Sequence, residues 1–212
     1  MPATSAPLHF GSIRVKTPMV MPGQRVGVMG GSFNPPHEGH AMVAATALKR
    51  LKLDQLWWLV TPGNPLKPTR GLSPLSERMA ACRTFAHGPK MRVTAFEAQL
   101  KTPYTAATLA FLRRRYPFVT FIWIMGADNL ATFHRWQHWR AIARDMSIAV
   151  IDRPGWRLKA LSSPAARALA RTRLPEQAAA RLGQRLHPRW TLLSARLSEA
   201  SSTHLRNQVA RL

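Results

Sequence analysis

Two histidines stand three residues apart in a stretch rich in glycine and proline, Gly30-Gly31-Ser32-Phe33-Asn34-Pro35-Pro36-His37-Glu38-Gly39-His40. An apolar run precedes the stretch and a helical pattern follows it, so we predict a strand, a tight turn and the start of a helix. His37 and His40 then lie one turn apart on the same helix face. We expect Pro36 at the first helical position, where its fixed φ suits a helix and its missing N–H loses no partner.

The chemistry of such a junction is the binding of an anion. Gly30 and Gly31 let the backbone approach a bulky ligand, and the first N–H groups of a helix carry partial positive charge. No lysine follows Gly39, which excludes the Walker A loop, and the glycine order excludes the dinucleotide fingerprint. The two histidines are one residue too close for the zinc-protease motif. Phosphate handling by two imidazoles remains, with the alternative that both histidines only cap or pack.

The same stretch resembles the signature of the nucleotidyltransferase superfamily with the His-x-Gly-His motif. It resembles more closely the nicotinate-nucleotide adenylyltransferases, whose version is Gly-Gly-x-Phe-x-Pro-x-His-x-Gly-His. A second block, Ser201-Ser202-Thr203-His204-Leu205-Arg206, is similar to the superfamily's Ser-Ser-Thr-x-x-Arg motif. A third block is similar to the one that distinguishes the nicotinate branch: Gly126-Ala127-Asp128-Asn129-Leu130, then Phe133-His134-x-Trp136-x-x-Trp139. The resemblance covers the chain from about Val26 to Arg206.

The resemblance implies an enzyme that joins nicotinate mononucleotide to ATP, giving deamido-NAD and pyrophosphate, with Mg²⁺ held mainly by the substrate. It implies catalytic roles for His37, His40 and Arg206. The residues it implies for ATP binding are Gly30, Gly31, Ser32, Phe33, His37, His40, Gly126, Asp128, Ser201, Ser202, Thr203 and Arg206. The residues it implies for the mononucleotide are Asn64, Lys67, Tyr104, Thr105 and Trp136. His134 is interpreted as structural, and we predict no metal site made by the protein.

Several of these roles have a plain physical alternative. Thr105 stands at the start of a predicted helix, whose free N–H groups can bind a carboxylate. Nicotinate has a carboxylate and nicotinamide does not. The alternative is that Thr105 does no more than cap the helix. Asp128 would bind ribose hydroxyls or cap a helix that starts at Asn129. Trp136 would stack on the pyridine ring, although aromatic residues three apart, such as Trp136 and Trp139, more often share a core-facing helix face. Ser202 or Thr203 would cap a terminal helix whose N-terminus binds phosphate oxygens, and Arg206 would form a bidentate contact with two of these oxygens. The alternative is a capped terminal helix with a solvated arginine.

The loop Thr61-Pro62-Gly63-Asn64-Pro65-Leu66-Lys67-Pro68 leaves the carboxyl end of a predicted strand, where open α/β sheets bind ligands. The resemblance places the corresponding loop at the nucleotide site, so Asn64 and Lys67 are candidates to bind the mononucleotide. The alternative is an ordinary surface loop rich in proline.

Composition sets the outer limits. The chain has 212 residues, enough for one α/β domain with a full core. Although 46% of its residues are apolar, no apolar run approaches twenty, so we expect no membrane span. We interpret residues 1–24, with their four prolines, as a flexible leader before a domain over residues 25–212. The lone Cys82 suits a reducing cytosol, and we expect a cytoplasmic location.

The net charge of +22 comes from 31 Lys and Arg against 9 Asp and Glu. Such a chain attracts polyanions, so a nucleic-acid-binding protein is the rival from another functional class. The arginines are spread along the chain without a recognised nucleic-acid-binding motif, and a positive field also steers ATP and a mononucleotide. A second alternative, within the enzyme class, is that the acceptor is nicotinamide mononucleotide or another phosphate monoester.

Strand-like and helix-like segments alternate from Arg25 onward, which predicts an α/β fold: a Rossmann-like, doubly wound parallel sheet of five to six strands in a single domain. The predicted strands are 25–29, 55–60, 91–94, 118–125, 147–151 and 190–193. Predicted helices run over 38–51 and over 73–86, with Ser73 as the cap, and another opens at Tyr104. A helical stretch rich in alanine and arginine follows over 164–186, interrupted at Pro175.

Overall fold

Six apolar segments form one sheet, in which each strand pairs in parallel with its neighbours. The computed structural model describes residues 16–63, 71–100, 104–184 and 188–195. Within these residues the strand order is β3-β2-β1-β4-β5-β6. The strands are β1 (Arg25–Gly31), β2 (Gln55–Val60), β3 (Met91–Thr94), β4 (Thr120–Gly126), β5 (Ser147–Ile151) and β6 (Trp190–Leu193). The prediction of a doubly wound parallel sheet is confirmed.

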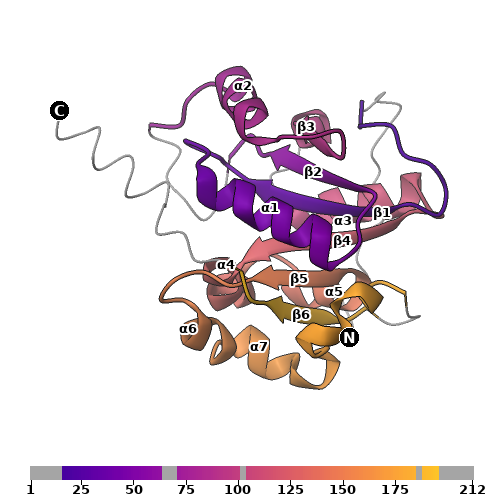
Figure 1. The fold of residues 1–212 in the computed structure, drawn as a ribbon, viewed down its shortest axis with the longest axis vertical. Coiled ribbons are helices and arrows are strands. Elements are labelled where there is room, and N and C mark those ends of the chain that lie inside the picture. The colour runs from indigo at the N-terminus through magenta and orange to yellow at the C-terminus, as the bar shows by residue number, and fades with distance from the viewer. Residues whose placement is uncertain (1–15, 64–70, 101–103, 185–187, 196–212) are drawn as a thin grey trace, which may run out of the picture.

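Helices cover both faces of the sheet (Figure 1). On one face lie α1 (Glu38–Arg50) and α2 (Leu75–Phe85), together with the 3₁₀ turn η4 (Glu176–Arg181). The other face is covered by α3 (Thr105–Arg115), α4 (Ala127–Thr132), α5 (Trp139–Asp145), α6 (Arg157–Leu161) and α7 (Pro164–Ala168). Three shorter 3₁₀ segments complete the order: η1 (Phe96–Leu100), η2 (Phe133–Arg135) and η3 (Ala170–Thr172). Because both faces are covered, the central strands can be apolar at nearly every position.

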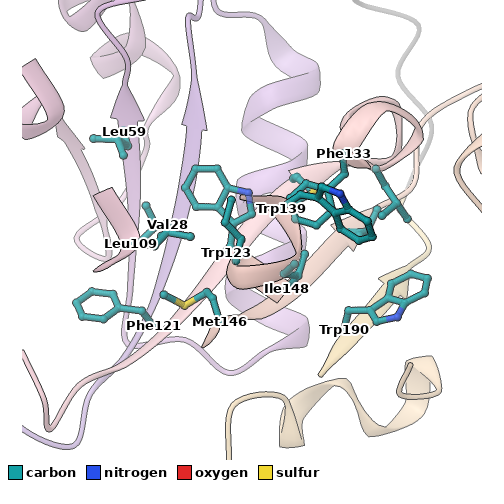
Figure 2. Close-up of a cluster of buried hydrophobic side chains, with 14 of the residues drawn as sticks. Val28, Leu59, Leu109, Phe121, Trp123, Phe133, Trp139, Met146, Ile148 and Trp190 are labelled. Carbon is teal, nitrogen blue, oxygen red and sulfur yellow. The ribbon is translucent and has the colours of Figure 1, made fainter. Parts of the chain in front are cut away.

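Two hydrophobic cores lie on opposite faces of the sheet. Figure 2 shows part of the first, in which Val28, Phe121 and Ile148 of neighbouring strands pack near Leu109 and Trp139. The second core packs Trp58 and Ile124 against α1 and α2. Alternate residues of one strand point to opposite faces, which is why the adjacent Trp57 and Trp58 belong to different cores. The sheet is therefore a rigid base for the loops at its carboxyl edge.

The order of the strands reverses direction between β1 and β4. Chain order runs outward from β1 to β3 on one side and from β4 to β6 on the other. In sheets of this kind the loops after the two central strands part in opposite directions and leave a crevice at the carboxyl edge, where ligands bind. The glycine-rich turn follows β1, and Gly126 and Asp128 lie at the end of β4. The topology thus brings the two predicted ATP-binding segments to the same edge.

Several helix starts differ from the predictions. His37, not Pro36, precedes α1 directly, so Pro36 lies outside the helix. Pro74 is the capping residue of α2 without a side-chain cap, and Ser73 is held instead through its backbone. The helix after β4 begins at Ala127, which places Asp128 inside its first turn and rules out a cap of a helix starting at Asn129. Local propensity misjudged these starts because hydrogen bonds at each end decide where the helix begins: His37 and His40 cap α1, and Asn34 holds Ser73 before α2.

Residues 16–24 correct the prediction of a separate leader over residues 1–24. The Gly23 N–H donates to the Phe118 carbonyl at 2.7 Å, and the Gln55 side chain donates to the Met19 carbonyl at 2.9 Å. The Thr17 hydroxyl and the Tyr116 hydroxyl share a hydrogen bond, and Val20 packs on the first core. These contacts fasten the segment to the amino edge of the sheet, which composition alone could not reveal. Residues 1–15 lie outside the described residues.

Cys82 is completely buried in α2 and packs in the second core. Burial raises the pKa of its thiol to about 12, although Arg78 and Arg83 oppose the shift. The residue therefore behaves as a small apolar side chain, in agreement with its place on a buried helix face.

Among the described residues, no helix has both the length and the apolar character needed to cross a membrane.

We expect Gly30→Ala to destabilise the fold. A Cβ at Gly30 would stand 2.3 Å from the outer edge of the Trp123 indole, which is buried and cannot easily retreat. Overpacking of this kind costs about 1–3 kcal/mol in the free energy of unfolding, which urea titration measures. Adding Trp123→Phe shortens the opposing side chain, so the double variant should lose less than the sum of the two single losses. Additive losses would show that the ring does not oppose residue 30.

Candidate active site

The two histidines of the glycine-rich stretch cap α1 reciprocally. The Gly39 N–H donates to Nδ1 of His37 at 3.1 Å, and the His37 N–H donates to Nδ1 of His40 at 3.3 Å. The two rings lie with their centroids 3.9 Å apart. An imidazole whose Nδ1 accepts a backbone N–H is neutral with its proton on Nε2. Capping therefore turns both Nε2 atoms into hydrogen-bond donors.

His37 has a further property that capping does not explain. The residue is only 3% exposed, and its buried Nε2 atom has no hydrogen-bond partner in the part of the chain that the structure describes. Burial, aided by the nearby charge of Arg153 and opposed by Asp128, lowers the pKa of His37 from 6.5 to about 4. The ring thus stays neutral near pH 7 and keeps an unsatisfied N–H. Such a donor is expensive to leave unpaired, which is typical of a group that awaits a ligand.

Aromatic rings hold the second histidine in place. The Phe33 ring meets His40 edge-on at a centroid distance of 5.0 Å and packs against Trp58 at 5.3 Å. Phe33 itself has a φ of 45°, a left-handed conformation that non-glycine residues rarely adopt. Its ring also fills the space beside Gly31. The tight turn therefore directs Phe33 inward as a support for His40.

On the side-chain side of the turn, the two glycines have a packing role that the sequence did not predict. The space that a Cβ would take at Gly30 is occupied by Trp123, and at Gly31 by Phe33. Both glycines thus make room for aromatic rings of the chain itself. This packing is sufficient to require glycine at both positions, and their contact with a ligand stays a prediction.

Asp128 forms an ion pair with Arg153, a residue for which the sequence predicted no role. Its Oδ2 accepts from Nη1 of Arg153 at 3.3 Å, while its Oδ1 is buried and unpartnered. Arg153 follows β5, the strand beside β4, so the two residues meet at the carboxyl edge. A Cβ at Gly126 would stand 2.4 Å from Asp128 Oδ1, so only glycine leaves room for this carboxylate. Asp128 and Arg153 both act on the pKa of His37, which places the pair beside it.

A shallow pocket lies next to this pair. It is lined by residues of α1, by the loop after β5 and by the end of the described chain: Gly39, Met42, Val43, Asp152, Arg153, Pro154 and Ala195. Gly39 separates the two histidines in sequence, and Arg153 pairs with Asp128. The pocket thus shares Gly39 with the start of α1 and Arg153 with the pair at Asp128.

Two residues predicted for the mononucleotide side, Tyr104 and Thr105, lie at the start of α3. Tyr104 precedes α3 with no side-chain cap, and Thr105 is the first residue inside the helix, so the alternative that Thr105 caps α3 is wrong. One turn further, the buried Thr108 hydroxyl donates to Oε1 of Glu97 at 2.6 Å. Among the described residues, no side-chain cap thus supplies an acceptor at the α3 N-terminus.

Trp136 is joined to the site through one intermediate ring. It contacts Trp123 edge-on at a centroid distance of 6.2 Å, and Trp123 covers Gly30. The expectation that Trp136 and Trp139 share a helix face is wrong, because Trp136 follows η2 and only Trp139 belongs to α5. Trp139 is buried in the core and Trp136 is partly exposed. The structure therefore separates the two tryptophans, and the stacking role of Trp136 stays a prediction.

Six of the predicted site residues lie outside the described part of the chain: Asn64, Lys67, Ser201, Ser202, Thr203 and Arg206. Their roles remain predictions.

Comparison with known proteins agrees with this geometry. A family model described as cytidylyltransferase-like matches residues 28–208. A probable nicotinate-nucleotide adenylyltransferase of Brucella abortus is 56% identical over 181 residues, which cover 85% of this chain and 93% of the relative. One from a Bradyrhizobium species is 54% identical over 183 residues, covering 86% and 95%. The chain belongs to the nicotinate-nucleotide adenylyltransferases.

Solved structures share the fold of this nicotinate-nucleotide adenylyltransferase. The Plasmodium falciparum nicotinic acid mononucleotide adenylyltransferase complexed with NaAD superposes with a TM-score of 0.66 at 16% identity, covering 87% of this chain and 83% of the other. The same protein complexed with APC gives a TM-score of 0.64 at 15% identity, with the same coverage. At such identities the likeness concerns the fold alone.

Sequence reasoning missed two arginines in this member of the nicotinate-nucleotide adenylyltransferases. Arg153 pairs with Asp128, and the buried Arg78 contacts the turn after β1. Arg153 stands two residues beyond a predicted strand, a position that could have marked it as a ligand-side residue. Arg78 gave no such signal, because it lies in the middle of a helix among other charged residues.

The titration of His37 should make this enzyme less stable in mild acid. Its folded-state pKa of about 4 lies below the value of 6.5 expected in the unfolded chain. As the pH falls, the unfolded state binds the proton first, so this contribution to stability is present above pH 6.5 and is lost progressively down to about pH 4. Between pH 7 and pH 5 the loss amounts to about 2 kcal/mol.

Urea unfolding at these two pH values tests the assignment. The variant His37→Asn keeps a good capping residue but cannot titrate, so its stability should fall less between the two pH values than that of the wild type. His87→Asn removes an exposed histidine and should follow the wild type. Equal pH dependence of wild type and His37→Asn would contradict the lowered pKa.

Proposed function

We propose that this chain transfers the adenylyl group of ATP to nicotinate mononucleotide, giving deamido-NAD and pyrophosphate, a step of NAD biosynthesis. The observation that carries the proposal is the buried, neutral His37, whose Nε2–H lacks a partner at the carboxyl edge of β1. Relatives at 54–56% identity bear the name of this activity, and the neighbours solved with NaAD and with APC share the fold.

The proposed reaction needs no general base. The phosphate of the mononucleotide is already anionic and attacks the α-phosphorus of ATP in line, while pyrophosphate departs on the opposite side. The task of the protein is to align the two substrates and to stabilise the charge that develops on the phosphate oxygens. Two preformed N–H donors, Nε2 of His37 and Nε2 of His40, suit this task because capping fixes their direction before the substrate arrives.

Other parts of the site take complementary roles in the proposal. Asp128, held by Arg153, would receive the ribose hydroxyls through its buried Oδ1. The uncapped N-terminus of α3 at Thr105 would receive the nicotinate carboxylate, with Trp136 stacking on the pyridine ring and Tyr104, Asn64 and Lys67 completing the mononucleotide side. The hydroxyls of Ser201, Ser202 and Thr203 and the guanidinium of Arg206 would hold the triphosphate.

Mg²⁺ belongs to the proposal as part of the ATP substrate. Among the described residues, no three His, Cys, Asp or Glu side chains are grouped so that they could hold a metal ion. Asp128, whose charge acts on the pKa of His37, is already paired with Arg153. We therefore propose that the phosphate oxygens hold the ion, which offsets their negative charge.

A change at His40 should abolish turnover and spare the fold. Losing one donor to a developing oxyanion costs about a hundredfold or more in kcat, whereas loss of the capping contact costs only about 1 kcal/mol of stability. Pyrophosphate release from ATP and nicotinate mononucleotide measures the effect for His40→Ala, and His87→Ala supplies the surface control. Near-normal turnover of His40→Ala would remove this residue from the mechanism.

The acceptor should be the acid and not the amide. A carboxylate at the uncapped start of α3 gains hydrogen bonds and a favourable helix dipole that an amide cannot match, so we expect kcat/KM to favour nicotinate mononucleotide by about tenfold or more. Parallel assays with the two mononucleotides decide between this proposal and the nicotinamide alternative. If neither mononucleotide gives pyrophosphate release and the chain instead binds RNA or DNA with a steep salt dependence, the protein is a nucleic-acid-binding protein and the proposed function is wrong.

A further inference from the structure

Arg78 is a buried arginine whose partners are backbone carbonyls. It lies on α2 and is 3% exposed. Its Nη1 donates to the carbonyls of Ser32 at 2.7 Å and Thr61 at 2.8 Å, its Nε to that of Ser73 at 2.8 Å, and its Nη2 to that of Pro62 at 3.4 Å. None of the ion pairs among the described residues includes it.

The four carbonyls come from three separate segments. Ser32 belongs to the turn after β1, Thr61 and Pro62 follow β2, and Ser73 stands before α2. Asn34 adds to the same junction, because its Nδ2 donates to the Gly71 carbonyl at 2.9 Å and its Oδ1 accepts the Ser73 N–H at 3.2 Å. One guanidinium thus fastens the turn that precedes the two histidines to the end of the neighbouring strand.

We propose that Arg78 is a positioning residue that sets the spacing between the turn after β1, on the ATP side of the active site, and the end of β2, which leads into the loop predicted to bind the mononucleotide. This inference rests on the proposed function, since it concerns the alignment of those two substrates. In-line attack requires the phosphate oxygen and the α-phosphorus to meet within a narrow range of distance and angle. A misplacement of about 1 Å can cost a hundredfold in rate even when both substrates still bind.

A guanidinium suits this junction better than other cations. It is planar and carries five N–H donors in fixed directions, so one side chain can reach carbonyls of three segments at once. Lysine has a single ammonium group on a flexible chain and cannot donate to carbonyls of three segments in fixed directions. Burial lowers the pKa of Arg78, and the carbonyl dipoles offset part of the cost of the buried charge. An arginine here is therefore a costly feature for the fold.

Arg25 provides a matched control within the same chain. Its Nη2 donates to the carbonyls of Leu51, Ala180 and Leu182 at 3.2, 3.2 and 2.8 Å, and burial lowers its pKa too. It differs in place, because it begins β1 at the amino edge of the sheet, opposite the histidines. Loss of Arg25 should thus destabilise the fold through the same kind of contact without moving the substrates.

The test compares Arg78→Gln and Arg78→Lys with Arg25→Gln and Arg25→Lys in the full chain. Each variant is measured by urea unfolding, by calorimetric titration with ATP and with nicotinate mononucleotide separately, and by kcat from pyrophosphate release. We expect all four to lose stability. Only the Arg78 variants should lose about thirtyfold or more in kcat, while each substrate alone binds within about threefold of the wild type.

The outcomes separate this inference from the proposed function. A wild type without activity overturns the proposed function. An active wild type together with an Arg78→Gln variant that loses less than about thirtyfold in kcat, or with an equal loss of kcat in Arg25→Gln, overturns the positioning role. If Arg78→Gln does not fold, the same thresholds applied to the conservative Arg78→Lys decide.

Discussion

The reciprocal capping of α1 is the interaction on which the site depends. A helix start leaves backbone N–H groups that need acceptors, and here the acceptors are the Nδ1 atoms of His37 and His40. The same two bonds that begin the helix therefore decide which nitrogen of each ring carries a proton. A structural requirement and a chemical one are met by the same atoms, so the donors are already oriented in the free protein.

Burial and charge then set the state of the first ring. His37 is surrounded by protein and lies near Arg153, and both factors keep it neutral. The strongly basic chain around it supplies a long-range attraction for polyanions, while the ring itself contributes a directed N–H without adding a further charge. Attraction and orientation are thus divided between different parts of the molecule. This division also explains why the net charge alone could not distinguish an enzyme from a nucleic-acid-binding protein.

Much of the fold could be predicted because buried parallel strands leave a simple signal. The segments 55–60, 91–94, 147–151 and 190–193 were predicted with the bounds that the structure has. Helix starts were harder, since α2 begins after Pro74 and α4 begins at Ala127 without a side-chain cap that would mark the start in the sequence. Single residues were hardest. The glycines at positions 30 and 31 stood out, yet the rings that require them lie at Trp123 and Phe33 and could not be paired with them by spacing.

Prediction of the site from the sequence was limited in the same way. Motif spacing predicted that His37 and His40 lie together, because one helical turn fixes their separation. It could not predict the tautomers, which depend on backbone N–H groups, or the pairing of Asp128 with Arg153, which depends on the order of β4 and β5 in the sheet. Arg78 lay beyond reach for a related reason. Its carbonyl partners carry no side-chain signature, since every residue has a carbonyl.

The burial of Cys82 has a practical consequence. It is the one cysteine in the chain, its side chain has no exposed surface, and its thiolate form is suppressed. Alkylating reagents act on exposed thiolates, so Cys82 should not be modified in the folded protein. A cysteine introduced at a surface position would carry a fluorophore or spin label as the single modified residue, without any need to replace Cys82 and disturb the core that it fills.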